Sequence, residues 1–293
     1  SVTMNAASME NSGFEFSATY RNRDHAFKYD ISANLSTLKN KVTSLGIGKD
    51  SYISGAYATY VGQEIGQFYG WVYEGIARTQ ADLDNHATQQ GVNVGDCLYK
   101  DISGPEGTPD GVIDAYDQTV LGSGLPKVNF GLSTHMEYKG FDLNISTYGV
   151  LNYHVSDDIY NSLNSCYGYG NKEVGMLDAN RWSEDGTYLS SVPRTYAANN
   201  ATLAWNDLFC SRKIQNAAYW KIANVELGYN FPDKWFGGYV SGVRLYVSAQ
   251  NLYTFTGYHG YNVDYAGGTF TPGYNFCSFP SARTFMAGLH FTF

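Results

Sequence analysis

The sequence predicts an all-β protein that forms part of an antiparallel transmembrane β-barrel, and three patterns support this fold class. Seven segments alternate apolar and polar residues, as strands with one apolar and one polar face do. Short and long connections between the segments also alternate along the chain. Aromatic residues gather where the segments meet the short connections. A membrane barrel combines these properties, because its strands separate lipid from a polar lumen and its long loops lie outside.

The alternation defines seven strands in order, over residues 14–20, 27–35, 128–138, 141–147, 223–231, 243–249 and 285–293. Short connections join strands one and two, three and four, and five and six, and they are RNRDH, KG and residues 232–240. Long segments separate these pairs, over residues 36–127, 150–217 and 254–282. Compact domains rarely contain structureless loops of this length, whereas outer-membrane barrels carry long external loops routinely.

The apolar side of the strands carries aromatic rings near the short connections: Tyr20, Phe27, Tyr29, Tyr138, Phe141, Tyr229, Phe231, Phe291 and Phe293. Because flat amphipathic rings sit at lipid headgroups, they predict one aromatic girdle on the periplasmic side. Phe293 then lies on that side, and the odd-numbered strands run inward. A soluble β-sandwich is the weaker interpretation, since it would scatter its aromatics along the strands and have loops of similar length.

The composition limits which partners the protein can bind and where in the cell it can lie. Charged residues are 16% of the chain and the net charge is −8 without a basic patch, which argues against nucleic acid as a partner. No run approaches 18 apolar residues, so we expect no transmembrane helix. The opening residues SVTMNAASMENSG lack the features of a secretory signal. We therefore expect either a cytoplasmic protein or a piece of a longer chain.

The four cysteines do not indicate a metal site. Cys97, Cys166, Cys210 and Cys277 lack the CxxC spacing that is typical of zinc ligands. In an oxidising compartment one or two disulfides would form, and four unpaired thiols are an equally good interpretation.

Seven strands cannot form a sealed wall in lipid by themselves. An open sheet has two edges, and their backbone N–H and C=O groups would have no partners in hydrocarbon. We therefore expect the chain to be the C-terminal part of a larger barrel, paired with further strands on both sides.

Several stretches have a specific resemblance, among them GQFYGWVYEGI (66–76), DGVIDAYDQTVLG (110–122), AAYWKIANVELGYNFP (217–232) and FPSARTFMAGLHFTF (279–293). Together with other stretches between residues 10 and 262, they resemble the C-terminal third of SusC/RagA-like TonB-dependent outer-membrane transporters of Bacteroidetes. The resemblance implies a plugged barrel of roughly 22 strands. It also implies that the plug domain and the N-terminal strands are absent from residues 1–293.

The resemblance further implies active import of oligosaccharides across the cell outer membrane, driven by TonB and assisted by a SusD-like surface lipoprotein. Import of oligopeptides is the alternative within the same family. A passive porin and a surface adhesin are alternatives of other classes. No phosphate-binding loop, nucleophile motif or HExxH sequence is present, so the chain is not expected to be an enzyme.

An acidic stretch, DISGPEGTPDGVIDAYD over residues 101–117, resembles a calcium-binding loop. The predicted ligands of a structural Ca²⁺ are Asp101, Ser103, Asp110, Asp114 and Asp117. Extra residues interrupt the usual spacing, so a DG turn with solvated carboxylates is the alternative.

Aromatic residues of the long segments are the candidates for ligand contact, because sugars bind flat aromatic faces among a few polar groups. The predicted contacts are Tyr69, Trp71, Tyr73, Tyr169, Trp182, Trp205 and Tyr261. The alternative for each ring is packing within the loops or against the lipoprotein.

Overall fold

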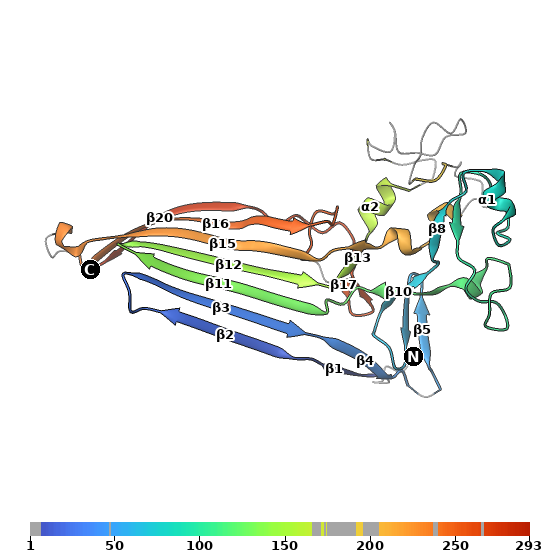
Figure 1. Ribbon diagram of the computed structural model, residues 1–293, viewed down its shortest axis with the longest axis horizontal. Helices are drawn as coiled ribbons and strands as arrows, with labels where there is room; N and C mark the ends of the chain where they lie inside the picture. Colours follow the sequence, from blue (N-terminus) through green and yellow to red (C-terminus); the bar gives the residue numbers. More distant parts are fainter. Residues whose placement is uncertain are drawn as a thin grey trace, which may run out of the picture.

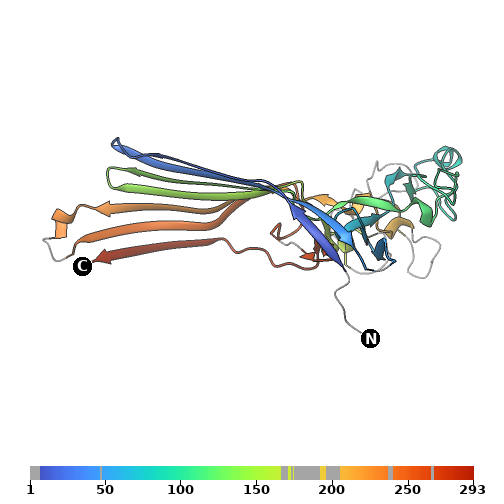
Figure 2. The ribbon, with the colours of Figure 1, turned by 90° about the horizontal axis from the view of Figure 1, so that it is seen from below.

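The computed structural model describes residues 7–46, 48–165, 171–172, 174, 192–195, 205–236, 240–264 and 267–293. A long, twisted sheet occupies one end of the molecule (Figures 1 and 2). The other end is a body of smaller sheets and short helices, which we call the loop body, formed by the described residues within 39–123, 152–216 and 257–283. No helix in the described part of the chain is long and apolar enough to cross a bilayer.

The long sheet contains seven strands in antiparallel pairs, and it confirms all seven predicted strands. In spatial order they are β2 (Glu15–Asn22), β3 (Phe27–Thr37), β11 (Val128–Tyr138), β12 (Phe141–Leu151), β15 (Tyr219–Phe231), β16 (Gly242–Thr256) and β20 (Thr284–Thr292). The short connections and the C-terminus lie together at the end far from the loop body (Figure 1). At the opposite end the strands run further than predicted, since β15 begins at Tyr219 and β16 ends at Thr256.

The register of the sheet separates an apolar face from a polar face. One row of paired residues crosses all seven strands through Tyr20, Ile31, Thr134, Ile145, Val225, Ala249 and Phe285. The adjacent row is polar throughout and consists of Thr19, Ser32, Ser133, Ser146, Asn224, Gln250 and Thr284. Because successive side chains point to opposite faces, these rows lie on opposite sides of the sheet.

The apolar face is not covered by a second layer of described residues. Ile31, Val247 and Leu289 are 38%, 51% and 58% exposed, although they lie in the middle of strands. Large aliphatic side chains in the interior of a soluble sheet would be buried. The exposure therefore agrees with strands that face lipid on this side.

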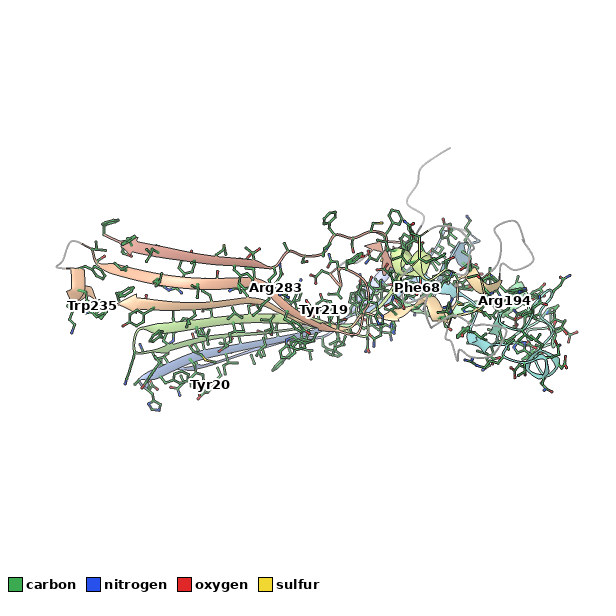
Figure 3. All side chains as sticks on the ribbon, turned by 90° about the horizontal axis from the view of Figure 1, so that it is seen from above. Tyr20, Phe68, Arg194, Tyr219, Trp235 and Arg283 are labelled. Atoms are coloured by element: carbon green, nitrogen blue, oxygen red, sulfur yellow. The ribbon has the colours of Figure 1, made fainter. Side chains whose placement is uncertain are left out.

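The predicted aromatic girdle at the short connections is present. Ring centroids are 5.9 Å apart in Tyr20–Tyr29, 4.7 Å in Phe141–Tyr229 and 5.0 Å in Tyr229–Phe231. Figure 3 shows Tyr20 near this end of the sheet, where Trp235 extends the girdle by packing on Phe231. The rings therefore gather on the apolar face near the short connections.

A second aromatic cluster, which the sequence analysis missed, lies at the opposite end of the apolar face. Trp220 stacks on Phe255 at 5.4 Å, and Phe255 contacts Tyr253 at 4.7 Å. A β-bulge at Ala223 shifts the register of β15 against β12, because Asn224 and Ile222 pair with the adjacent residues Ser146 and Thr147. The bulge reverses the alternation in β15, so that Trp220 points to the apolar face although its position in the sequence predicts the polar face.

The long segments, which were predicted as external loops, contain short strands of their own. In the first segment a four-stranded sheet has the order β10 (Thr119–Ser123), β7 (Gln67–Gly70), β6 (Tyr57–Tyr60) and β5 (Ser51–Ser54). Two-stranded sheets pair β1 (Ser8–Ser12) with β4 (Lys39–Ser44), β8 (Tyr73–Ile76) with β9 (Cys97–Tyr99), and β17 (Gly267–Gly268) with β18 (Thr271–Pro272). The short helices are α1 (Gln80–Asp84), α2 (Asp158–Leu163) and the 3-10 helices η1 (Ala115–Asp117), η3 (Ser211–Lys213) and η4 (Asp233–Phe236).

The loop body joins all three long segments into one structure. A three-stranded sheet pairs β14 (Gln215–Asn216), β13 (His154–Asp157) and β19 (Tyr274–Asn275), which come from the second and third segments. The first and second segments are joined through Asp96, which is 1% exposed and accepts hydrogen bonds from Arg194 Nε at 2.6 Å and Asn206 Nδ2 at 2.7 Å. Burial of this paired carboxylate fixes the two segments together.

A charged residue on the apolar face should destabilise the barrel. Ile145 lies midway between the two aromatic bands, so we expect Ile145→Arg to lower the free energy of unfolding by about 2–4 kcal/mol. The matched control is Ser146→Arg on the polar face, which we expect to change it by about 0.5 kcal/mol. Urea unfolding of the full-length protein in lipid vesicles measures both, and equal effects would contradict a lipid-facing side.

Candidate functional site

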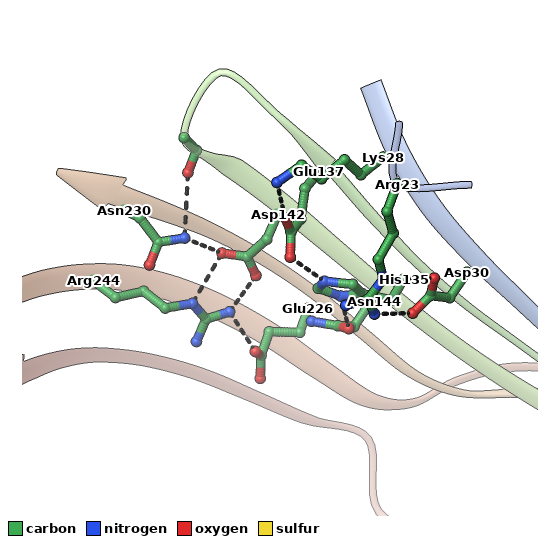
Figure 4. Close-up of polar contacts among 11 residues, drawn as sticks. Arg23, Lys28, Asp30, His135, Glu137, Asp142, Asn144, Glu226, Asn230 and Arg244 are labelled. Carbon is green, nitrogen blue, oxygen red and sulfur yellow. Dashed lines mark hydrogen bonds and ion pairs between the residues drawn. The ribbon is translucent and has the colours of Figure 1, made fainter. Parts of the chain in front are cut away.

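Charged side chains form a network on the polar face near the short connections (Figure 4). Arg244 of β16 donates to both oxygens of Asp142, from Nε at 3.0 Å and from Nη2 at 2.5 Å. The same guanidinium donates to Glu226 at 2.7 Å, and Asn230 donates to Asp142 at 2.9 Å. Gly228 makes room for this arrangement, because a Cβ atom there would lie 2.5 Å from Arg244 and Asp142.

The network continues across the neighbouring strands. His135 Nδ1 lies 2.6 Å from Asn144 Oδ1, and His135 Nε2 lies 2.8 Å from Glu137 Oε1. Lys28 Nζ is 3.8 Å from Glu137, and Arg23 forms an ion pair with Asp30. The carboxylates of this network are therefore paired with cations or amides. They form a polar surface and not a pairing of a nucleophile with a general base.

At the other end of the polar face, an ion pair fixes the segment between β16 and β20. Lys221 of β15 is 4% exposed and pairs with Asp264, which also accepts a hydrogen bond from the Tyr148 hydroxyl at 3.3 Å. Because the ammonium is almost fully buried, losing Asp264 would leave an uncompensated charge. The ion pair therefore holds this segment against β12 and β15.

A buried polar cluster lies beside this ion pair in the loop body. The Tyr258 hydroxyl donates to Asp157, and Asn275 Nδ2 lies 2.8 Å from the Tyr258 hydroxyl and 3.2 Å from Asp157 Oδ2. Burial raises the pKa of Tyr258, so its hydroxyl stays protonated and donates to the carboxylate. Asp157 also accepts from the Tyr160 amide at 2.9 Å and so caps α2. The cluster thus connects α2, β19 and the segment after β16.

Among the predicted ligand-binding aromatics that the structure describes, Tyr261 is the most accessible. It is 65% exposed and borders a recess of about 210 Å³ that is also lined by Lys221, Asn251, Thr254 and Asn262. An aromatic face beside amides and hydroxyls is the arrangement expected for a sugar. Ligand contact by Tyr261 stays a prediction.

Trp71 and Trp205 are half-buried and instead pack against a buried cluster of the loop body. Their rings flank Tyr99, with centroids 6.3 and 6.0 Å away. The indole N–H of Trp71 donates to the Asp114 carbonyl at 3.1 Å, and that of Trp205 donates to the Gln90 carbonyl at 2.8 Å. This geometry agrees with the alternative stated for them, packing within the loops. Tyr99, which is fully buried between the two indoles, was not singled out from the sequence.

The remaining aromatic candidates have different surroundings. Tyr73 is half-buried, with the Arg212 guanidinium 5.9 Å from its ring, and burial raises the pKa of Tyr73 to about 12. The Tyr69 ring lies 6.4 Å from that of Tyr60. Tyr169 and Trp182 lie outside the described residues.

The acidic loop is organised around one buried carboxylate. Asp117 is 0% exposed and accepts hydrogen bonds from the amides of Ile102 at 2.8 Å, Ser103 at 3.1 Å and Asp114 at 2.8 Å. Asp101 accepts from the Gly111 amide at 2.7 Å. The loop therefore uses its acids to bind its own backbone N–H groups.

The calcium site stays a prediction. Within the described residues, no group of three or more His, Cys, Asp or Glu side chains is placed to hold a metal ion. The side chains of Asp110 and Asp114 each accept a hydrogen bond from the backbone N–H two residues further on, at 3.0 and 2.8 Å. One observation favours a cation, because Asp101 Oδ1 is buried without a hydrogen-bond partner.

Comparisons with known proteins show what the chain is similar to. No protein-family model matches the chain. TonB-dependent receptor P3 of Formosa agariphila is 30% identical over 312 residues, which cover 100% of this chain and 30% of the receptor. TonB-dependent receptor SusC of Bacteroides thetaiotaomicron is 26% identical over 307 residues, covering 100% of this chain and 27% of SusC. The chain is homologous to TonB-dependent receptors of the SusC type.

The fold of the receptor family is shared as well. The RagAB peptide transporter superposes with a TM-score of 0.76 at 21% identity, over 97% of this chain and 29% of the matched chain. The seven-stranded sheet is therefore part of an outer-membrane β-barrel wall. The chain spans about 30% of the length of the curated receptors that it matches.

Loss of the buried carboxylate should open the acidic loop. Asp117→Ala leaves three backbone amides without their acceptor, so we expect a local loss of about 3 kcal/mol. Hydrogen exchange of the amides at positions 102, 103 and 114, in the full-length receptor, measures it. Asp110→Ala is the matched control, because this exposed residue bonds only a nearby amide. Equally fast exchange in both variants would contradict the central role of Asp117.

Titration calorimetry with Ca²⁺ tests the predicted metal. If the loop holds a structural ion, the full-length receptor takes up Ca²⁺, and Asp101→Asn abolishes the uptake because it removes the charge of the orphaned oxygen. Absence of Ca²⁺ uptake, together with unchanged hydrogen exchange in chelator, would reject the site.

Proposed function

We propose that this chain supplies part of the barrel wall and of the external mouth of a TonB-dependent importer in the outer membrane. The observation that carries the proposal is a seven-stranded sheet with one uncovered apolar face, one polar face of paired charges, and a folded body at a single end. This is the form expected of a wall between lipid and a polar passage. The full-length similarity of the chain to TonB-dependent receptors supports an importer over a passive porin or a surface adhesin.

The proposed importer needs parts outside this chain. The strands β2 and β20 are the edges of the sheet, and each must pair with a further strand in hydrocarbon. The rest of the barrel and a plug would complete the passage, and TonB would act on that part of the protein. A SusD-like lipoprotein would cap the loop body and hold substrate against it.

The proposed substrate class is oligosaccharide. Tyr261 supports it, since an exposed ring borders a recess with the amides of Asn251 and Asn262. An oligopeptide is the second candidate, favoured by the structural similarity to the RagAB peptide transporter.

Uptake by whole cells tests the proposal. We expect deletion of the complete gene to abolish uptake of labelled oligosaccharides, and depletion of TonB to have the same effect, because import against a gradient needs energy from the inner membrane. Labelled oligopeptides are the matched probe. Uptake that persists without TonB would indicate a porin, and selective loss of peptide uptake would indicate the oligopeptide importer.

A further inference from the structure

A recess of about 390 Å³ lies in the loop body between the β5–β6 hairpin and the start of β18. Two of its walls are the rings of Tyr52 and Phe270, which are 50% and 48% exposed. Their centroids are 5.9 Å apart and their planes are inclined by 61°. The volume falls within the range of pockets that bind small ligands.

Tyr57 lines this recess, and its buried hydroxyl is the observation that points to a ligand. Tyr57 is 8% exposed, and its hydroxyl has no hydrogen-bond partner among the described residues. Its ring is held by Phe68, with centroids 5.4 Å apart. A buried polar group without a partner is costly, so native structures seldom retain one without a role. Thr59, also in the lining, is in contrast satisfied by the Gly66 amide at 2.9 Å.

Burial raises the pKa of Tyr57, so the hydroxyl stays protonated and is available as a donor. Ser54 and Thr271 add two further hydroxyls to the lining. The recess therefore presents apolar rings on its sides and a few hydroxyls beside them.

We propose that this recess binds one pyranose ring of a neutral oligosaccharide. The C–H face of the sugar lies against Tyr52 and Phe270, and one sugar hydroxyl accepts the hydrogen bond of Tyr57. The inference rests on the proposed function and deepens it, because it places a subsite for the imported glycan on the external side of the barrel.

The charge around the recess favours a neutral sugar. Lys49 is the one cation in its lining, and Asp50 follows it directly in the sequence. An apolar peptide side chain would fill the space but would leave the Tyr57 hydroxyl without a partner. A pyranose satisfies both the rings and the hydroxyl.

Calorimetry on the full-length receptor tests the subsite with maltotetraose, cellotetraose and xylotetraose as probes. We expect at least one to bind, and Tyr57→Phe to weaken its affinity roughly tenfold, because the variant keeps the ring and removes one hydrogen bond. Phe270→Ala removes a wall and should weaken binding further. Tyr116→Phe is the matched control at an exposed tyrosine outside the lining and should leave affinity unchanged.

Thermal unfolding of the same variant gives a readout that needs no ligand. Since the Tyr57 hydroxyl has no partner, Tyr57→Phe should unfold at the same or a higher temperature, and a clear fall would overturn the proposal by showing a structural role. Binding of none of the three sugars, or equal affinity in the variant, would overturn it as well. If TonB-dependent uptake persists in either case, the proposed subsite is rejected and the proposed importer is retained. If the wild type shows no such uptake, the importer fails.

Discussion

Complete pairing of backbone hydrogen-bond groups between neighbouring strands is the constraint on which this structure depends. An unpaired N–H or C=O in hydrocarbon costs several kcal/mol, so a membrane wall of strands must pair each strand with both neighbours. The five strands between β2 and β20 meet this condition, and their ladders thereby fix the register. Register in turn decides which side chains meet lipid, because a shift of one residue exchanges the two faces. The bulge at Ala223 makes such a shift locally and turns Trp220 outward.

The two ends of the polar face are stabilised in different ways. Near the short connections, Arg244 serves two carboxylates, Asp142 and Glu226, so the strands are cross-linked within the wall. At the mouth, Lys221 pairs with Asp264 and so connects the wall to the loop body. Both arrangements pair buried or half-buried charges within the chain, so this face of the sheet stays polar.

The wall could be predicted from the sequence, and the loop body could not, for a physical reason. A strand between lipid and a polar lumen alternates apolar and polar residues apart from bulges. The strands through Ile145 and Val225 are therefore visible in the sequence. Strands of the loop body are two to six residues long and are stabilised by contacts between distant segments. Period-two patterns are too short to detect there, and buried rings such as Tyr99 resemble exposed ones. The sequence could not separate packing rings from ligand-binding rings for the same reason. Trp71 packs against the buried Tyr99, whereas Tyr261 is exposed.

Contacts between segments that are distant in sequence limit how the ligand specificity of the loop body can change. The backbone N–H of Tyr73 donates to the Ser211 hydroxyl across 138 positions of sequence at 3.0 Å, and β13 pairs with β19 at a similar separation. Exchanging one long segment with that of a relative would therefore break contacts that it makes with another segment. Transplanting recognition between two such receptors requires moving all three segments as a unit, and insertions are tolerated only where no second segment packs against them.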